Sequence, residues 1–225
     1  MSATEAVDHT TINRPLSGAG VQQISDEQAG GILPARAFGA HKWDVGGVLL
    51  IGGSPTYVGA VALAALAAQR AGAGIVQLAV PHGIISPLVP TIPEATYIPL
   101  PETESASGAR NAVALIAEQG DRAAALLIGP GLGQDESVKG LLGALFGAPE
   151  AVRSIGFGGS RDNTAKARGD SSSDEPLARG GKPLVIDADG LNWLSAQDDW
   201  SNLLAPGSAV LTPHPGELAR LLQRE

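Results

Sequence analysis

The chain is 225 residues long, enough for one domain with a full hydrophobic core, and 44% of its residues are apolar. Its formal net charge of -8 argues against nucleic acid as a partner, because a phosphate backbone requires a basic protein surface. The absence of cysteine excludes disulfides, and no apolar run is long enough to span a membrane. The first twenty residues also lack the apolar core of a secretory signal, so we expect a cytoplasmic protein without a membrane partner.

The N-terminal stretch, residues 1–24, is polar, and we expect it to form a flexible tail. Ser25 then provides a favourable N-cap for a short helix, with Glu27 and Gln28 in its first turn. This helix should end before Pro34, because proline restricts the residue that precedes it.

A strand–helix–strand unit follows, with apolar strands at 48–51 and 75–80 and an alanine-rich helix at 59–71. Its length is that of a right-handed crossover between parallel strands. Gly52 and Gly53 join the first strand to the helix and leave the turn without side chains, so that a ligand can approach backbone N–H groups. The alternative is a tight turn with no ligand. The spacing matches neither a Walker A loop nor a Rossmann dinucleotide loop.

The middle of the chain predicts a second series of strands and helices. Four prolines between residues 81 and 93 allow only short pieces of helix there. A glycine-rich turn, Gly-Pro-Gly-Leu-Gly at 129–133, suits an anion or, alternatively, is only a turn stiffened by proline. The expected elements are a strand at 95–98, a loop at 101–107, a helix at 109–119, a strand at 123–128 and a helix at 137–146.

Residues 148–182 differ from the rest, because they are rich in glycine, serine and charged residues and offer almost nothing to bury. We expect a disordered insertion there. A functional lid is the alternative.

The C-terminal part contains two more short apolar strands, at 183–186 and 209–211, and each ends in polar residues. Asp187 and Asp189 follow the first strand, and Thr-Pro-His-Pro-Gly-Glu at 212–217 follows the second. A helix at 191–204 should connect them, and a last helix should begin near residue 216. The acids suit a phosphate or a metal–phosphate complex, although Asp and Gly after a strand can also serve only to cap the next helix.

Continuous apolar strands separated by helices indicate an α/β fold whose parallel sheet is buried on both faces. In such folds, ligands bind beyond the carboxyl ends of the strands. Both polar runs of the C-terminal part would lie at that edge of the sheet.

Five sequence blocks, in this order, resemble the ADP/ATP-dependent NAD(P)H-hydrate dehydratase family. They are HKxDxGxVLxIGGS from His41, AxALAAxRAGAGxVxxAVP from Ala60, GPGLG from Gly129, DADGLN from Asp187 and TPHPGE from Thr212. The resemblance implies a ribokinase-like fold, a three-layer α/β/α sandwich with a central, mainly parallel sheet. It also implies repair of the S form of hydrated NADH or NADPH: ADP or ATP phosphorylates the added hydroxyl with the help of Mg²⁺, and loss of phosphate restores the reduced cofactor.

The resemblance also implies roles for individual residues. The damaged cofactor would lie against Gly59, Ala60, Gly131 and His214. The nucleotide phosphates would lie beside Gly52, Gly53 and Asp187, and Glu217 would position Mg²⁺ or its water. Asp189 is left open between a ligand and a helix cap, and His214 between a ligand contact and a turn histidine. Homo-oligomers are common in the family, so we expect one here.

Two departures from the family pattern stand out. Trp43 replaces the glycine that usually follows His-Lys, which suggests an altered loop at that point. The family's GTGD motif, whose aspartate is the catalytic base, occurs nowhere in the chain. We therefore assign no catalytic residue, and expect a domain at 25–225 that is truncated at its C-terminus and has little activity alone. We also expect the isolated chain to associate through uncovered apolar surface.

Two other functions stay open. One is a ribokinase-like kinase of a small molecule such as a vitamin alcohol, which would accumulate a phosphoester instead of releasing phosphate. The other is a non-catalytic module that binds the cofactor and has lost its catalytic end.

Overall fold

The computed structural model describes residues 24–33, 35–101, 106–148 and 176–223. It separates the chain into two compact units, Met1–Gly39 and Ala40–Glu225. The described part of the first unit contains helix α1 (Asp26–Ile32), whose N-cap Ser25 exchanges hydrogen bonds with Gln28 in a capping box. This confirms the helix predicted after Ser25. The tail predicted at 1–24 lies almost wholly outside the described residues, and the domain limits of 25 and 225 stay a prediction.

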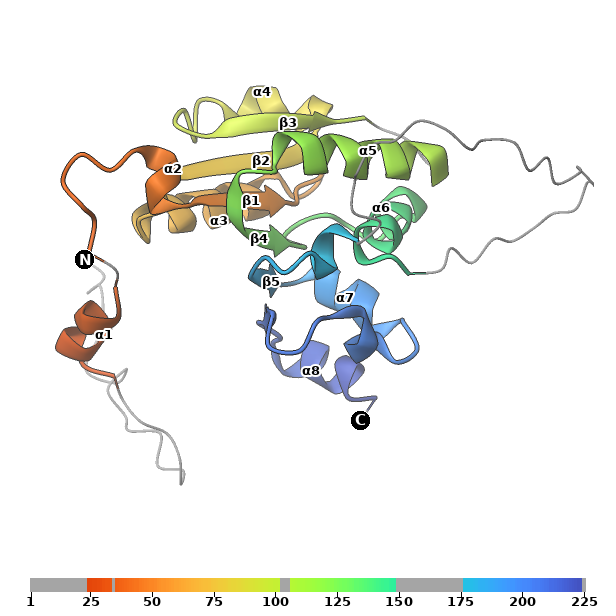
Figure 1. Cartoon of the computed structure of the whole chain (residues 1–225). Helices are drawn as coiled ribbons and strands as arrows, with labels where there is room; N and C mark the ends of the chain where they lie inside the picture. Colours follow the sequence, from red (N-terminus) through yellow and green to blue (C-terminus); the bar gives the residue numbers. More distant parts are fainter. Residues whose placement is uncertain (1–23, 34, 102–105, 149–175, 224–225) are drawn as a thin grey trace, which may run out of the picture. The chain divides into compact units, whose positions relative to one another are not determined.

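The second unit is built on a six-stranded sheet of order β3-β2-β1-β4-β5-β6, and every pairing between neighbouring strands is parallel. This confirms the parallel sheet expected from the continuous apolar runs (Figure 1). The strands are β1 (Gly47–Ile51), β2 (Ile75–Pro81), β3 (Thr96–Leu100), β4 (Ala123–Ile128), β5 (Leu184–Ile186) and β6 (Ala209–Leu211).

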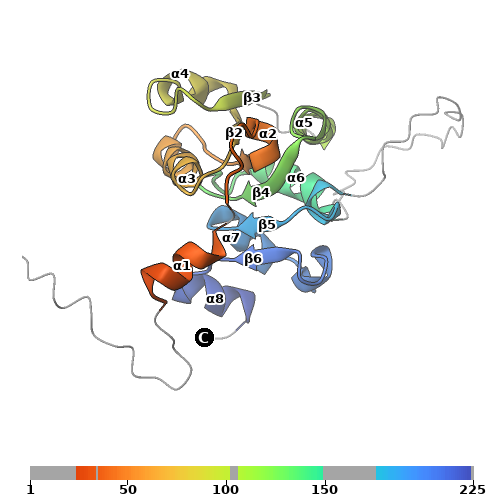
Figure 2. The same cartoon turned by 60° about the vertical axis from the view of Figure 1, so that its left-hand side comes forward.

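Helices cover both faces of the sheet, so the unit has the three layers that the sequence predicts (Figure 2). The helices α3 and α4 pack on one face, and α5 and α6 pack on the other. The helices are α2 (Lys42–Val45), α3 (Val58–Arg70), α4 (Ile85–Leu88), α5 (Ala106–Gln119), α6 (Glu136–Phe146), α7 (Asp189–Ser195) and α8 (Pro215–Leu221), with 3₁₀ helices η2 (His82–Ile84), η3 (Leu177–Arg179) and η4 (Trp200–Leu203). No described helix is long and apolar enough to cross a membrane.

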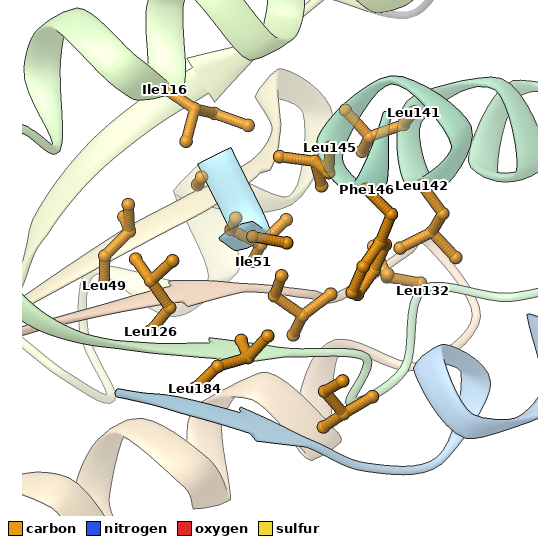
Figure 3. Packing of buried hydrophobic residues seen from close by; sticks show 14 of the residues in the cluster. Leu49, Ile51, Ile116, Leu126, Leu132, Leu141, Leu142, Leu145, Phe146 and Leu184 are labelled. Carbon is orange, nitrogen blue, oxygen red and sulfur yellow. The ribbon is translucent and has the colours of Figure 1, made fainter. Parts of the chain in front are cut away.

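The larger core cluster lies between the sheet and α6. Leu141, Leu145 and Phe146 of α6 belong to one cluster with Leu49 and Leu126 of the central strands (Figure 3). All five side chains are buried. Because burying one such side chain contributes about 1.5–3 kcal/mol relative to leaving it exposed, this face is a main source of stability.

The strand order changes direction between β1 and β4, the two central strands. The chain leaves β1 for α3 on one face and leaves β4 for α6 on the opposite face. The two connections therefore separate at the carboxyl ends of these strands. This topological switch point is where α/β sheets bind ligands.

The helix predicted at 191–204 is wrong in its extent. The structure has α7 at 189–195 and, after a break, the separate 3₁₀ helix η4 at 200–203. Asp199 adopts φ 50° at the start of η4, and this left-handed conformation cannot continue an α-helix. Similarly, α5 begins at Ala106, inside the loop that the sequence predicted at 101–107. The four-residue helix α2 was not predicted.

The insertion predicted at 148–182 lies mainly outside the described residues. Its last seven residues, 176–182, are described and pack on the domain. Ala178 of η3 is buried in the core beside α6, and the Lys182 ammonium donates to the Asp121 carbonyl oxygen at 2.5 Å. The prediction of disorder therefore remains open only for 149–175.

Candidate active site

The glycine turns after β1 and β4 meet at the switch point. The Gly53 N–H donates to the Pro130 carbonyl oxygen at 2.8 Å, and the Gly52 N–H donates to the Ala79 carbonyl oxygen at 3.3 Å. Both glycines are buried. Their N–H groups, which the sequence suggested for phosphate binding, already have acceptors within the protein.

Gly131 brings the second turn against the start of α3. It adopts φ 70°, and a Cβ at this position would lie 2.7 Å from the Tyr57 carbonyl oxygen and 3.0 Å from the Ala60 Cβ. Only glycine fits both the conformation and the space. Gly59 is exposed beside Ala60 in the first turn of α3. Three of the four residues predicted to contact the damaged cofactor therefore lie together.

The N-terminus of α3 has no side-chain cap, because its N-cap residue is Tyr57. The first N–H groups of a helix have no intrahelical acceptor, and the helix dipole gives them a partial positive charge. Nearby, the Ser54 hydroxyl oxygen is buried and has no hydrogen-bond partner among the described residues. The first N–H groups of α3 and the Ser54 hydroxyl are therefore hydrogen-bond donors near the contact between Gly131 and α3.

Gly129 joins the same turn to the loop after β5. It adopts φ 126°, and a Cβ there would collide with the Asp187 carbonyl oxygen. The Asp187 N–H in turn donates to the Ile128 carbonyl oxygen at 3.1 Å. The loop of Asp187 therefore lies directly beside the glycine-rich turn, at the carboxyl edge of the sheet.

The two aspartates of this loop have different surroundings. Within the described part of the chain, Asp187 accepts one hydrogen bond, at 2.8 Å, from the Thr212 hydroxyl after β6. Asp189 accepts the Gly133 N–H at 2.8 Å and longer bonds from the side chains of Gln134 and Asn192, at 3.5 and 3.4 Å. Asp187 therefore retains acceptor capacity for a ligand, whereas both oxygens of Asp189 are already engaged.

Asp189 does not cap the helix that follows it, which was one of the two roles left open by the sequence. It is the first residue of α7, whose N-cap is Ala188, so it does not cap the helix. Its carboxylate instead holds Gly133 across 56 positions of sequence. Ala188 adopts φ 48°, which is uncommon for a residue with a side chain and occurs often at functional sites.

His214 and Glu217 form a capping box at the start of α8. The His214 Nδ1 accepts the N–H groups of Gly216 at 3.0 Å and of Glu217 at 3.4 Å, and the Glu217 Oε2 accepts the His214 N–H at 2.9 Å. An accepting Nδ1 carries no proton, so this arrangement requires the neutral imidazole with its proton on Nε2. The His214 side chain is 62% exposed, and its Nε2 lies 3.5 Å from the Glu217 Oε1.

Mg²⁺ would find few protein ligands here. No three or more acidic, histidine or cysteine side chains of the described chain lie close enough together to hold a metal ion. In phosphoryl-transfer sites, Mg²⁺ takes one or two carboxylates and otherwise phosphates and waters. Asp187 is available for that role. Glu217 is 7% exposed, uses Oε2 for its cap and has its Oε1 3.5 Å from the His214 Nε2.

Three residues beside the predicted set were missed by sequence reasoning. Thr212 orients Asp187, Asn192 contacts Asp189, and the exposed Tyr57 borders Gly131. Thr212 had a detectable signal, since a hydroxyl directly after a buried strand lies at the same edge as the neighbouring acid. The other two depend on packing between distant segments.

The helix α6 begins beside this site with a conventional cap. Asp135 accepts the Val138 N–H at 2.9 Å and the Ser137 hydroxyl at 2.6 Å. The hydrogen bond from the Ser137 side chain, followed by that from the Val138 backbone, lowers the pKa of Asp135 below its ordinary value. Asp135 is therefore a charged structural cap.

Trp43, a departure from the family pattern, lies at the other end of the sheet. Its ring packs against Gly47, the first residue of β1, and the Arg122 guanidinium lies 4.4 Å from the ring centroid. Gly47 pairs with Ile75, which begins β2. Trp43 therefore contacts the amino end of the sheet, whereas the candidate site is at the carboxyl end.

The parallel sheet, its order and the glycine-rich turns at the switch point define a doubly wound α/β protein. Among solved structures, a ribokinase-like superfamily protein from Enterococcus faecalis matches with a TM-score of 0.60, covering 84% of this chain and 52% of that chain at 24% identity. This likeness confirms the ribokinase-like fold.

The sequence profile of the NAD(P)H-hydrate dehydratase family matches residues 48–152 and 149–224. The chain belongs to this family. A bifunctional NAD(P)H-hydrate repair enzyme of Moorella thermoacetica is 37% identical over 190 residues, covering 84% of this chain and 30% of that protein. The ADP/ATP-dependent NAD(P)H-hydrate dehydratase of Bacillus subtilis, crystallised with ATP and Mg²⁺, matches at 26% identity with a TM-score of 0.58, covering 92% of this chain and 57% of that one. The chain thus spans about a third of the length of the curated relatives that it matches.

Proposed function

We propose that this chain functions in the repair of hydrated NADH and NADPH, in which ADP or ATP phosphorylates the added hydroxyl and loss of phosphate restores the reduced ring. The observation that carries this proposal is the contact of Gly131 with the first turn of α3, beside Asp187 at the switch point of the sheet. Membership of the family supports the same conclusion.

The damaged nicotinamide ring would lie on the surface formed by Gly59, Ala60 and Gly131. These residues have little or no side chain, so a flat ring can approach the backbone closely. His214 would donate a hydrogen bond from Nε2, since its Nδ1 is engaged by the backbone of α8. The position of the ring over these residues follows from the family resemblance.

Asp187 would lie beside the phosphates and take part in holding Mg²⁺, with Thr212 fixing its carboxylate. The metal would supply positive charge that offsets the developing charge on the transferred phosphoryl group. Glu217 would contribute Oε1, directly or through water. For Gly52 and Gly53 we propose a supporting role near the phosphates, because their N–H groups are engaged within the protein.

No residue of this chain is assigned as the catalytic base, because no Gly-Thr-Gly-Asp sequence occurs in it. We therefore expect the 225-residue chain to bind the damaged cofactor and the nucleotide but to turn over slowly. Homo-oligomer formation and a cytoplasmic location remain predictions.

The test is calorimetry of the chain with hydrated NADH and with ADP, with Gly59→Leu as the blocking variant. A side chain at Gly59 meets nothing within 4 Å and lies in a helix, so this change fills the ring site without strain. The matched control is Gly31→Leu, an exposed helical glycine in α1 that also has open space. We expect Gly59→Leu to weaken binding of hydrated NADH at least tenfold and Gly31→Leu to leave it unchanged.

If the unsubstituted chain binds neither ligand, the proposal is wrong. Product analysis after prolonged incubation with ADP or ATP and Mg²⁺ separates the remaining alternatives. Release of phosphate with return of NADH supports the dehydratase. A stable phosphoester of a vitamin alcohol would instead indicate a kinase, and binding without any turnover would indicate a non-catalytic module.

A further inference from the structure

We propose that Arg220 binds a phosphate group of the bound nucleotide and that Asn192 is the positioning residue that holds its guanidinium at the carboxyl edge of the sheet. This inference rests on the proposed function and adds to it an anion contact in α8. The phosphate belongs either to the damaged dinucleotide or to ADP or ATP, two sources that share the same chemistry.

A chain of hydrogen bonds connects Arg220 to the glycine-rich turn after β4. The Arg220 Nη2 donates to the Asn192 Oδ1 at 2.8 Å, and the Asn192 amide donates to the Asp189 Oδ1 at 3.4 Å. The Asp189 Oδ2 accepts the Gly133 N–H at 2.8 Å. Three segments, which follow β4, β5 and β6, are thereby joined through side chains.

The Asn192 amide has one consistent orientation in this chain of bonds. Its oxygen must face Arg220, because a guanidinium only donates, and its NH₂ must face Asp189, because an ionised carboxylate only accepts. Asn192 therefore fixes the direction of the Arg220 side chain. An aspartate or a leucine at this position could not make both contacts.

The Arg220 side chain runs back along α8 instead of extending past its end. Its Nη1 lies 3.8 Å from the position that a Cβ on Gly216 would take. Gly216 is in the first turn of the helix, next to His214. An arginine that only stabilised the C-terminus of α8 would instead approach the last carbonyl groups of the helix.

Arg220 supplies positive charge at an edge of the sheet that is otherwise acidic. We define the rim as the four segments 52–57, 129–135, 187–192 and 212–220, which follow β1, β4, β5 and β6. The rim contains Asp135, Asp187, Asp189 and Glu217, and Arg220 is its one lysine or arginine. A phosphate approaching these acids requires a protein cation or a metal, and Arg220 is the protein cation present.

Arg220 also has unused capacity for a ligand. A guanidinium carries five N–H donors in a planar fork that matches phosphate oxygens. Among the described residues, its hydrogen bond is to the neutral amide of Asn192, and it forms no ion pair with a carboxylate. The side chain is exposed at the rim. The bond to Asn192 therefore fixes the guanidinium and leaves its other N–H donors for a ligand.

The experiment compares Arg220→Gln, Arg220→Lys and Asn192→Ala with the unsubstituted 225-residue chain by calorimetry. The probes are ADP with Mg²⁺, hydrated NADH, and hydrated nicotinamide riboside in its reduced form, which has the ring but no phosphate. The matched control is Arg179→Gln, because Arg179 also donates to a neutral oxygen, that of Asn202 at 2.9 Å, but lies outside the rim.

We expect Arg220→Gln to weaken the binding of one phosphate-bearing probe about tenfold or more, since hydrogen bonds to charged groups contribute that much. The binding of the riboside should be unchanged. Whichever phosphate probe is affected identifies the source of the phosphate. Arg220→Lys should recover part of the affinity for that probe. Added salt should weaken the binding of the probe by the unsubstituted chain more than its binding by Arg220→Gln. Asn192→Ala should weaken the same probe about threefold, and this effect should vanish in the Arg220→Gln background.

Equal binding of both phosphate probes by the unsubstituted chain and by Arg220→Gln would overturn this inference and leave the proposed function intact. An equal loss for the riboside would also overturn it, because it would assign Arg220 a merely structural role. Failure of the unsubstituted chain to bind any probe would overturn the proposed function together with the inference. If Arg220→Gln melts at a much lower temperature than the unsubstituted chain, its weaker binding can reflect partial unfolding. In that case the binding of the phosphate probes by Arg220→Lys tests the inference, since lysine keeps the charge and the aliphatic stem.

Discussion

The half of the sheet formed by β1, β2 and β4 and the half formed by β5 and β6 differ in strand length and in exposure. The strands β1, β2 and β4 have five, seven and six residues, and β2 is buried over its first six. The strands β5 and β6 have three residues each, and Val210 of β6 is 61% exposed. The second half nevertheless carries Asp187, Asp189 and His214. The longer strands thus belong to one half, while the side-chain hydrogen bonds of the candidate site belong mainly to the other, whose Leu184 and Ile186 are also buried in the core.

The largest effect should come from removing core side chains in the first half. Leu49 of β1 is 0% exposed, so Leu49→Ala should lower the free energy of unfolding by about 2–5 kcal/mol. Val210→Ala, at the exposed edge of the other half, should change it by less than about 0.5 kcal/mol. Urea denaturation measures both, and similar losses for the two variants would contradict the difference between the halves.

The fold could be predicted from sequence mainly where burial determines it. The strands at 48–51 and 123–128 agree with the structure to within one residue, because a strand covered on both faces must be apolar throughout. The helix predicted at 191–204 fails because the break between α7 and η4 depends on local backbone conformation, including that of Asp199. Apolar periodicity carries no information about such a break.

The site was predictable in its location but not in its contacts. Parallel strands bring their carboxyl ends to one edge, so Gly131 and Asp187 could be assigned to that edge from sequence. The partner of Asp189 is 56 residues away and could not be inferred from spacing. The engagement of the Gly53 N–H by Pro130 likewise depends on how two turns pack.

The contact between the two halves gives the next largest effect. Gly129 and Gly133 both have positive φ, of 126° and 85°, but a Cβ at Gly129 meets the Asp187 carbonyl oxygen while one at Gly133 meets nothing within 4 Å. Gly129→Ala should therefore cost about 2–3 kcal/mol of unfolding free energy, and Gly133→Ala about 1 kcal/mol, since both pay for backbone strain and only the first displaces the β5 loop. Equal losses would indicate that the two turns are not packed together as described.

The cap of α6 should show a smaller, pH-dependent effect. Asp135→Ala should lower the unfolding free energy by about 1 kcal/mol at neutral pH. The hydrogen bonds from Ser137 and Val138 lower the folded-state pKa of Asp135, so this stabilisation is complete above the unfolded-state pKa and is lost as pH falls through the folded-state pKa. Thermal melts at neutral and acidic pH should show the gap between the two proteins narrowing in acid. Asp135→Asn keeps an acceptor but does not titrate, and a persistent gap in acid would contradict a charged cap.

The smallest effect should come from the amino end of the sheet, and it tests whether the two ends of β1 are independent. Arg122 lies over the Trp43 ring, and an exposed contact of this type contributes about 0.5–1 kcal/mol. Arg122→Gln should lower stability by that amount and leave binding of hydrated NADH unchanged, because Trp43 packs on Gly47 at the opposite end of the strand from Gly52. Chemical denaturation and calorimetry measure the two quantities separately. Weaker binding of hydrated NADH by Arg122→Gln would mean that Trp43 influences the site through β1. Stability and binding would then be coupled along this central strand.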